Sequence, residues 1–277
     1  MIGAIVGDIA GSRFEFCNLK SKEFVLLAAE DEAEWGPASC FTDDTVMTLA
    51  VAQALADWRE SGSSDSGELS TMAVRAMQDF GRRYPRAGYG GHFAQWISEA
   101  DPRPYNSWGN GAAMRVSACG WAGRTLDEVK ALSRAVTEVT HDHPEGIKGA
   151  VATAVCVFLA RQGKSKDEIK AHVSEHYYPL DFTLDEIRPT YDFDVSCQGS
   201  VPQALEAFFE STSFEDAIRN AISIGGDSDT IGAITGSIAG AYYGVPNDIR
   251  NKALSYLDDF QRETISEFEA LWPEQRG

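Results

Sequence analysis

The stretch SIGGDSDTIGAITGSIAGAYYG, residues 223–244, decides how this chain folds. Two glycines and two aspartates, Asp227 and Asp229, precede an almost uncharged run of small and apolar residues, which predicts a helix over 230–243. Three glycines recur in it every four residues and therefore share one face of the helix: Gly232, Gly236 and Gly240. Because a glycine inside a helix costs about 1 kcal/mol relative to alanine, we expect this face to pack very closely on a neighbour.

An earlier stretch, CFTDDTVMTLAVAQAL at residues 40–55, places a second acidic pair before an apolar helix. An N-cap with acidic residues in the first turn explains Asp43 and Asp44, and Asp227 and Asp229 admit the same interpretation. The alternative is that the two clusters converge in space. Buried carboxylates cost several kcal/mol each unless a cation compensates them, and few lysines or arginines lie near either cluster in the sequence. Convergence would therefore require a bound cation.

The chemistry of these side chains indicates which cation would bind. Carboxylates and threonine hydroxyls are all oxygen ligands, which favour a hard ion such as Mg²⁺ or Mn²⁺ over zinc. Four aspartates carry up to four negative charges, which suits two divalent metal ions. Two such ions can hold and activate a bridging water. The residues alone therefore predict a binuclear, oxygen-ligated centre.

Composition limits the possible partners. The chain has 277 residues, 43% of them hydrophobic, and a formal net charge of −18, which is typical of a globular protein with one large domain or two small ones. Because no linker divides the sequence, we expect a single domain over 1–277. The acidic charge argues against general nucleic-acid binding.

Five scattered cysteines form no CxxC pair, which indicates reduced thiols and a cytoplasmic protein. The longest apolar run, 231–245, is too short to cross a membrane. The oligomeric state is left open, a monomer included.

Helical periodicity dominates the rest of the chain. It predicts ten helices, at 45–58, 69–84, 110–122, 126–139, 145–163, 166–177, 200–211, 214–223, 230–243 and 246–271. One segment, YDFDVS at 191–196, is the single candidate for a strand. So many helices in one chain predict an all-α bundle.

Six phrases, taken in order, resemble the ADP-ribosylglycohydrolase family. GAIVGDIAGSRFE (3–15) resembles its N-terminal helix signature, and FTDDT and GGDSDT resemble its two metal-ligand motifs. GYGG (88–91), GNGAAMRVS (109–117) and THDHPEGIKGA (140–150) resemble its substrate loops. The resemblance covers roughly residues 1–244, and six motifs in the family's order are a specific signal. It implies a compact, orthogonal multi-helix bundle with a binuclear magnesium or manganese cleft.

The resemblance also implies a role for individual residues. The metal ligands it implies are Thr42, Asp43, Asp44, Asp227, Asp229 and Thr230. The substrate-binding residues it implies are Gly88, Tyr89, Gly90, Gly109, Asn110, Gly111, Met114 and His141. Glu15 and Asp44 would be catalytic. Backbone amides of the GNGAAMR phrase, at an expected helix start, are expected to bind a pyrophosphate.

The implied reaction is metal-dependent hydrolysis of the C1″ glycosidic bond of an ADP-ribosyl group, which releases ADP-ribose. Such a bond breaks through an oxocarbenium-like centre, which nearby carboxylates and an activated water would favour. The substrate would be an ADP-ribosylated protein or a small ADP-ribose conjugate. Two alternatives remain: the same metal chemistry on O-acetyl-ADP-ribose or another conjugate, and a non-catalytic binding or structural relative.

Several neighbouring residues keep more than one interpretation. Arg115 is expected either to meet a phosphate or to form an internal ion pair. Asp8 is expected to form hydrogen bonds inside the bundle rather than to support a metal. Cys197 has no base near it in the sequence, so its loop is considered for the leaving-group side of the cleft instead. Trp108, immediately before GNG, is the tryptophan considered for ligand stacking.

Overall fold

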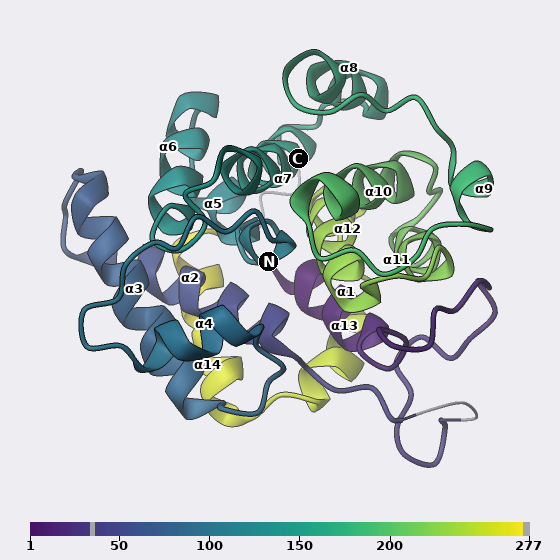
Figure 1. Ribbon diagram of the computed structural model, residues 1–277, viewed down its shortest axis with the longest axis horizontal. Helices are drawn as coiled ribbons and strands as arrows, with labels where there is room; N and C mark the ends of the chain where they lie inside the picture. Colours follow the sequence, from purple (N-terminus) through teal and green to yellow (C-terminus); the bar gives the residue numbers. More distant parts are fainter. Residues whose placement is uncertain (34–36, 274–277) are drawn as a thin grey trace.

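The computed structural model describes residues 1–33 and 37–273, and all regular secondary structure in these ranges is helical (Figure 1). In chain order the helices are α1 (Ile2–Gly11), α2 (Asp43–Glu60), α3 (Ser66–Arg83), α4 (Gly91–Ser98), the 3₁₀ turn η1 (Asn110–Ala112), α5 (Ser117–Ala122), α6 (Leu126–Thr137), α7 (Pro144–Arg161), α8 (Lys166–His176), α9 (Leu184–Ile187), α10 (Cys197–Phe209), α11 (Phe214–Ser223), α12 (Ser228–Tyr243), α13 (Asn247–Ser255) and α14 (Asp259–Leu271). The prediction of an all-α fold is confirmed.

The predicted helix 110–122 is wrong. The segment forms η1 and then, after a turn, α5. The reason is a long-range contact: the amide of Asn110 donates to the carbonyl oxygen of Val195 at 2.8 Å, so the chain starts a 3₁₀ turn there. The predicted strand at 191–196 is also wrong, because that segment is a loop with one isolated bridge to the residue preceding η1. Tertiary contacts override local periodicity at both places.

The predicted helix 246–271 is likewise wrong as a single element. It is divided into α13 and α14. Asp258 and Gln261 form a capping box that begins α14, which stabilises a new helix start and ends the preceding one. Three helices, α1, α4 and α9, were not predicted from periodicity, and only the family resemblance indicated the first of them; they contain 10, 8 and 4 residues.

Helix α1 packs along α12 through glycines, as the spacing of Gly232, Gly236 and Gly240 predicts. A Cβ atom on each of three residues of α1 would overlap backbone atoms of α12. The pairs are Gly3 with Gly236, Gly7 with Gly232, and Gly11 with Ser228. The two helices are therefore antiparallel, and the C-terminal end of α1 lies at the N-terminal end of α12. Figure 1 shows them side by side in the middle of the molecule.

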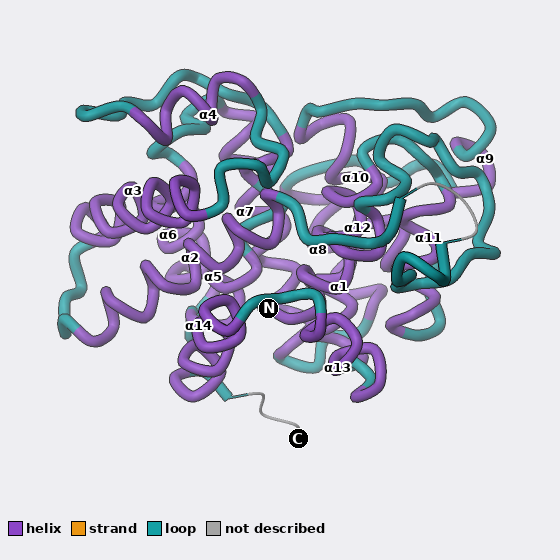
Figure 2. The backbone as a smooth tube through the Cα atoms, turned by 90° about the horizontal axis from the view of Figure 1, so that it is seen from below, coloured by secondary structure: helices purple, strands orange, loops and turns teal. Residues whose placement is uncertain are grey.

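The remaining helices surround this pair. Helix α2 contacts α1, α3, α5 and α14, while α7 contacts α5, α6, α10 and α12. In Figure 2 the long loops lie mostly along the edge of the molecule that carries α4 and α9, and α13 and α14 close the opposite side. No helix within 1–33 and 37–273 is long and apolar enough to span a bilayer. The architecture thus brings the starts of α2 and α12 together beside the loops.

Candidate active site

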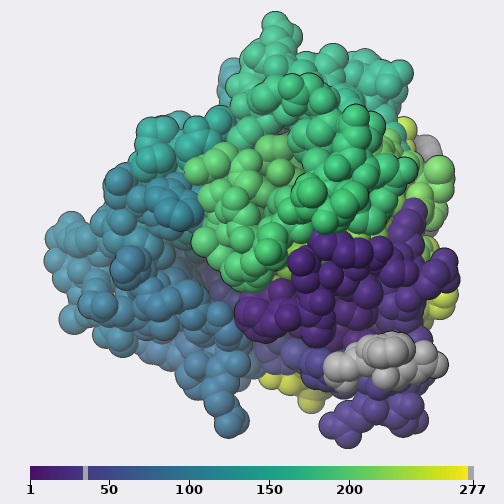
Figure 3. Space-filling model, turned by 45° about the vertical axis from the view of Figure 1, so that its right-hand side comes forward, coloured from purple at the N-terminus to yellow at the C-terminus, as the bar shows by residue number. Residues whose placement is uncertain are grey.

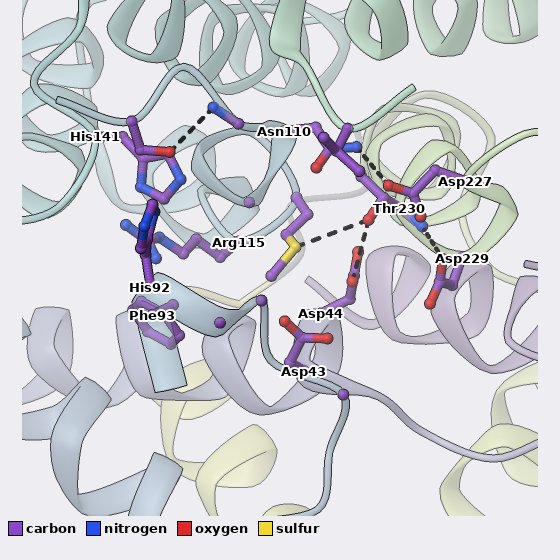
Figure 4. Close-up of a pocket in the computed structure, with 18 of the residues that line it drawn as sticks. Asp43, Asp44, His92, Phe93, Asn110, Arg115, His141, Asp227, Asp229 and Thr230 are labelled. Atoms are coloured by element: carbon purple, nitrogen blue, oxygen red, sulfur yellow. Dashed lines mark hydrogen bonds between the residues drawn. The ribbon is translucent and has the colours of Figure 1, made fainter. Parts of the chain in front are cut away.

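A cavity of ≈ 670 Å³ opens where α1, α2 and α12 meet the loops (Figure 4). Its acidic end is formed by side chains from both predicted metal motifs and from the end of α1: Glu15, Asp43, Asp44, Asp227, Asp229 and Thr230. Its other walls come from Gly88 and residues 90–93, from residues 105–111, 114 and 115, from His141, and from Phe193 and Val195. The two acidic clusters, which lie 183 or more residues apart in the chain, therefore converge as the second interpretation requires.

Carboxylates at the acidic end are close enough to share cations. Oxygen atoms of Asp8, Asp44 and Asp229 lie within 4.8 Å of one another, and so do those of Glu15, Asp227 and Asp229. The two groups have Asp229 in common. These groups contain Asp44, Asp227 and Asp229 of the motifs together with Asp8 and Glu15, and such oxygen ligands could bind a metal ion. The binuclear arrangement stays a prediction.

Burial and mutual repulsion make this cluster electrostatically unfavourable when it is fully ionised. Burial, reinforced by the charge of Asp229, raises the pKa of Asp43 to about 8, and burial, Asp229 and Asp8 raise the pKa of Glu15 to about 8. Burial raises the pKa of Asp44 and of Asp229 well above the usual range. In the described residues none of these carboxylates forms a salt bridge with Lys or Arg. Protons or metal cations must neutralise them.

Asp8 holds the start of α2 against α1. Its carboxylate accepts hydrogen bonds from the amide and hydroxyl of Thr42, at 3.0 and 2.7 Å, and from the amide of Thr45 at 3.0 Å. Thr42 in turn caps α2 by accepting from the amide of Asp44. The N-cap interpretation is thus correct for Thr42, whose side chain does not line the cavity. Its coordination of a metal stays a prediction.

The second acidic motif is arranged differently. Asp227 precedes α12, but its side chain makes no capping hydrogen bond. Its Oδ2 instead accepts from Nδ2 of Asn110 at 2.7 Å, and burial raises the pKa of Asp227 to about 6. Gly225 and Gly226 adopt φ values of 73° and 75°, which side chains rarely tolerate. This backbone turns the carboxylate toward the cavity rather than back onto its own helix.

Thr230 and Asp44 connect the two motifs directly. The hydroxyl of Thr230 donates to Oδ2 of Asp44 at 3.3 Å, and the sulfur of Met114 lies 3.9 Å from the same hydroxyl (Figure 4). The other oxygen of Asp44, Oδ1, is buried and has no hydrogen-bond partner among the described residues. A buried carboxylate oxygen left without a donor is an unsatisfied ligand. The residues present therefore fit a divalent cation.

The predicted substrate-binding residues are mostly brought to the cavity. Those that line it are Gly88, Gly90, Gly109, Asn110, Gly111, Met114 and His141. Tyr89 does not line it; its ring lies behind the wall, with its centroid 5.7 Å from that of Phe93. Amides of the GNGAAMR phrase are largely used within the protein, since those of Ala112, Ala113 and Met114 donate to nearby carbonyls. These three amides are therefore not free to bind an anion, and the anion site expected on the phrase as a whole stays a prediction.

His141 is held by a buried chain of hydrogen bonds. Nη2 of Arg115 donates to Oγ1 of Thr140 at 2.7 Å, and that oxygen lies 2.7 Å from Nδ1 of His141. Burial and the nearby Arg115 cation lower the pKa of His141 well below the usual range. The imidazole is therefore neutral near pH 7. A Cβ on Gly111 would lie 3.5 Å from its Nε2, which places this nitrogen beside the η1 loop at the cavity wall.

The structure contradicts one of the two roles expected of Arg115, the internal ion pair, and its contact with a phosphate stays a prediction. It is 1% exposed and forms no salt bridge within 1–33 and 37–273, so the internal ion pair is wrong. Its guanidinium lies 5.6 Å from the ring centroid of Phe93, and burial lowers its pKa to about 10. The guanidinium also lines the cavity. A buried cation without an acidic partner sits at the end of the cavity away from the aspartates (Figure 4).

Several cavity residues were not predicted. They include Phe16, His92, Phe93, Tyr105 and Phe193. Phe16 directly follows Glu15, and Phe193 lies in the loop that leads to Cys197. Trp108 lies on the cavity rim, whereas Cys197 is buried against Gly149. Burial raises the pKa of the Cys197 thiol to about 12, which excludes a thiolate near neutral pH.

Comparison with known proteins agrees with this geometry. The family model described as ADP-ribosylglycohydrolase matches residues 1–276. ADP-ribosylhydrolase ARH3 of Bos taurus is 29% identical, over 88% of this chain and 84% of that protein. ADP-ribosyl-[dinitrogen reductase] glycohydrolase of Rhodospirillum rubrum is 28% identical, over 98% of this chain and 93% of that protein. ADP-ribosylarginine hydrolase Tri1 of Pseudomonas putida is 26% identical, over 88% of this chain and 70% of that protein.

A solved structure, described as an ADP-ribosylglycohydrolase-related protein complex, shares the fold. It superposes with a TM-score of 0.68 and 23% sequence identity, and covers 99% of this chain and 97% of that one. The family model extends over nearly the whole chain, and the relatives with which it agrees are named as hydrolases. The chain therefore belongs to the ADP-ribosylglycohydrolase family and is a hydrolase of that family.

Proposed function

We propose that this protein is a metal-dependent hydrolase that cleaves the C1″ glycosidic bond of an ADP-ribosyl group and releases ADP-ribose. One observation carries the proposal: carboxylates from the segment after α1 and from the starts of α2 and α12 share one cavity, and within the described part of the chain no Lys or Arg forms a salt bridge with them. Relatives named for hydrolysis of ADP-ribosyl linkages support the class of substrate. The whole of 1–277 would act as one domain.

Two divalent ions, Mg²⁺ or Mn²⁺, would bind at the acidic end of the cavity, where the two carboxylate groups overlap at Asp229. The proposed ligands come from both motifs: Thr42, Asp43, Asp44, Asp227, Asp229 and Thr230. Asp8 would support them from α1 through its hydrogen bonds to Thr42 and Thr45. When bound, such ions supply an activated water and a binding site for a sugar diol.

Glu15 and Asp44 are the proposed catalytic carboxylates. Glu15 lies at the partly exposed edge of the cluster, so it can exchange a proton with solvent and reach a leaving group. Asp44 is buried and presents an oxygen without a partner to the cavity. Breaking the glycosidic bond builds positive charge on C1″, which nearby carboxylates stabilise.

The remaining walls would position the substrate. Neutral His141 would exchange a hydrogen bond with ADP-ribose through Nε2, as donor or acceptor according to its tautomer, and Arg115 adds positive charge to that end of the cavity. The loops at 88–91 and 109–111 place glycines where a ligand approaches the backbone. A volume of ≈ 670 Å³ is in the range typical of nucleotide-sized ligands. The acidic end would then hold the ribose that carries the scissile bond.

The experiment is a substrate panel. Purified protein is incubated with arginine-linked, serine-linked and O-acetyl ADP-ribose conjugates in Mg²⁺, Mn²⁺ or EDTA, and free ADP-ribose is quantified. Metal-dependent release from one substrate is expected. Release that persists undiminished in EDTA would contradict the metal centre, and no release from any member of the panel, with ADP-ribose still bound, would favour a binding protein.

A matched pair of variants tests the ligands. Asp229→Asn removes the carboxylate common to both groups, and we expect activity to fall at least about a hundredfold, together with loss of Mn²⁺ binding. Asp248→Asn makes the same change at an exposed aspartate in the first turn of α13 and should leave both unchanged. Full activity in the Asp229 variant would refute the assignment.

A further inference from the structure

Exposed apolar side chains gather at the mouth of the cavity. In the described residues five large hydrophobic side chains are exposed: Phe16 at 83%, Trp108 and Phe193 at 46%, Val195 at 45% and Val25 at 43%. All except Val25 line the cavity. Single exposed apolar residues need no explanation, but a cluster of them beside a polar site marks an interaction surface.

Two of these side chains form a pair across two chain segments. The rings of Phe16 and Phe193 stack with centroids 6.0 Å apart and an interplanar angle of 27°. Phe16 belongs to the segment that follows α1, and Phe193 to the loop that precedes α10. Figure 3 shows the purple N-terminal segment against the green part of the chain on this face. The aromatic pair is therefore built by tertiary contact and is left open to solvent.

Hydrogen bonds hold the two segments together next to the rings. Nδ2 of Asn18 lies 3.4 Å from Oδ1 of Asp192, and Nζ of Lys20 donates to the carbonyl of Tyr191 at 2.5 Å. Lys20 also donates to the carbonyl of Ile224, at the start of the second metal motif. These contacts tie the Phe16 segment to both the Phe193 loop and the turn between α11 and α12. The surface is thus preorganised, which lowers the entropy lost on binding.

The aromatic pair, defined as Phe16 and Phe193, adjoins the reacting end of the cavity. Phe16 directly follows Glu15, whose carboxylate lies within 4.8 Å of oxygens of Asp227 and Asp229. Arg115 and His141 lie at the other end. A conjugate whose ribose sits at the carboxylates and whose nucleotide extends toward Arg115 leaves its acceptor group nearest to the aromatic pair. A small acceptor such as acetate would not cover these rings.

Charge indicates the chemistry of the acceptor. Exposed Asp192 precedes Phe193, and the chain as a whole has a net charge of −18. Two divalent ions would still leave the protein strongly negative. Lysine and arginine side chains are attracted by this charge and also stack favourably on aromatic faces. An acidic partner would be repelled from the same surface.

We propose that Phe16 and Phe193 form a docking surface for the polypeptide that bears the ADP-ribosyl group, and that this polypeptide is basic next to the modified residue. The inference rests on the proposed function and adds the class of acceptor. It makes Phe16 and Phe193 determinants of specificity, and not catalytic residues. Acceptor recognition then occurs outside the carboxylate cluster, on side chains that no metal contacts.

The test compares two substrates on one set of variants. Phe16→Ala, Phe193→Ala and the double variant are assayed with ADP-ribosylated peptides that have basic flanks and with O-acetyl-ADP-ribose. Val25→Ala is the control, because Val25 is similarly exposed but does not line the cavity. For the double variant we expect kcat/KM on the peptide to fall on the order of tenfold, with little change on O-acetyl-ADP-ribose or in Val25→Ala.

Equal losses on both substrates, or none on either, would overturn the docking surface. Peptides with acidic flanks that are hydrolysed as well as basic ones would overturn the charge preference. Binding separates this inference from the proposed function. If wild-type protein hydrolyses neither substrate, the proposed function fails, but binding measured by fluorescence anisotropy still tests the docking surface. The ADP-ribosylated basic peptide should bind more tightly than ADP-ribose. The double variant should bind both with similar affinity. An unchanged difference would refute it.

Discussion

Gly7 and Gly232 are in direct backbone contact: a Cβ atom on Gly7 would overlap the carbonyl oxygen of Gly232. This contact lies next to Asp8 on α1 and near Asp229 on α12, whose carboxylates belong to one group within 4.8 Å. Close glycine packing is therefore what brings these two acids together. The helix contact and the candidate metal centre are parts of the same arrangement.

The first prediction concerns this contact. Gly7→Ala should destabilise the protein by at least about 2 kcal/mol, because overpacking against a rigid backbone exceeds the gain in helix propensity of about 1 kcal/mol. Urea unfolding followed by circular dichroism measures the change. Gly91→Ala, where a new Cβ meets open space at the start of α4, is the control. Equal stability of the two variants would contradict the packing argument.

Without metal, Tm should fall as pH rises, and the increase in Tm caused by divalent ions should grow with pH. The folded-state pKa values of Asp43 and Glu15 are raised to about 8, from ordinary values of 3.8 and 4.5. Groups with raised pKa values stabilise the fold below their unfolded pKa and lose that contribution as pH rises through the folded value. In EDTA, Tm should therefore fall between about pH 4 and pH 8, by roughly 2–4 °C for each kcal/mol lost.

Thermal melts at pH 5 to 8.5, in EDTA and in Mg²⁺ or Mn²⁺, check this dependence. Divalent ions should raise Tm more at the higher pH, because ionised carboxylates bind them and protonated ones do not. A stabilisation by metal that is the same at every pH would contradict the electrostatic account of the cluster.

The hydroxyl of Thr140 should be needed for ligand binding by His141. Thr140→Val removes the group between Arg115 and Nδ1 of His141, and we expect ADP-ribose affinity to fall about tenfold. Nitrogen NMR of the imidazole should show a changed tautomer population. Thr137→Val is a matched control, because that buried hydroxyl has no hydrogen-bond partner in the described residues. Comparable losses in both variants would indicate a general packing defect.

The neutral side chain of Asn110 should be needed for metal binding, because it donates a hydrogen bond to Asp227. Asn110→Asp replaces the amide that donates to Asp227 at 2.7 Å with a carboxylate, which would repel it and alter one of the two oxygen groups. We expect Mn²⁺ titrations followed by electron paramagnetic resonance to show weakened or altered occupancy of one ion. Asn251→Asp adds the same charge at an exposed position of α13 and should leave the titration unchanged. The same effect in both variants would mean that the change in net charge, and not the contact with Asp227, weakens Mn²⁺ binding.

The sequence by itself determined the helical class, the glycine face of α12 and the two acidic motifs. These properties are local: periodicity follows from 3.6 residues per turn, and small residues every four positions mark a close contact on whichever neighbour packs there. The motifs at 42–45 and 226–230 could be found for the same reason, because each is contiguous in the chain. Their convergence could be argued only from the energy of burying uncompensated acids.

Tertiary structure alone decided which further residues join the site. Asp8 enters the carboxylate group because the glycines of α1 meet α12, and Arg115 reaches His141 only through the hydroxyl of Thr140. Likewise, the 110–122 segment breaks because Asn110 is bound by the distant Val195 and Asp227. In each case the decisive hydrogen bond or contact joins residues far apart in sequence. Local pattern carries no information about such pairs, because their energy appears only once the helices have packed.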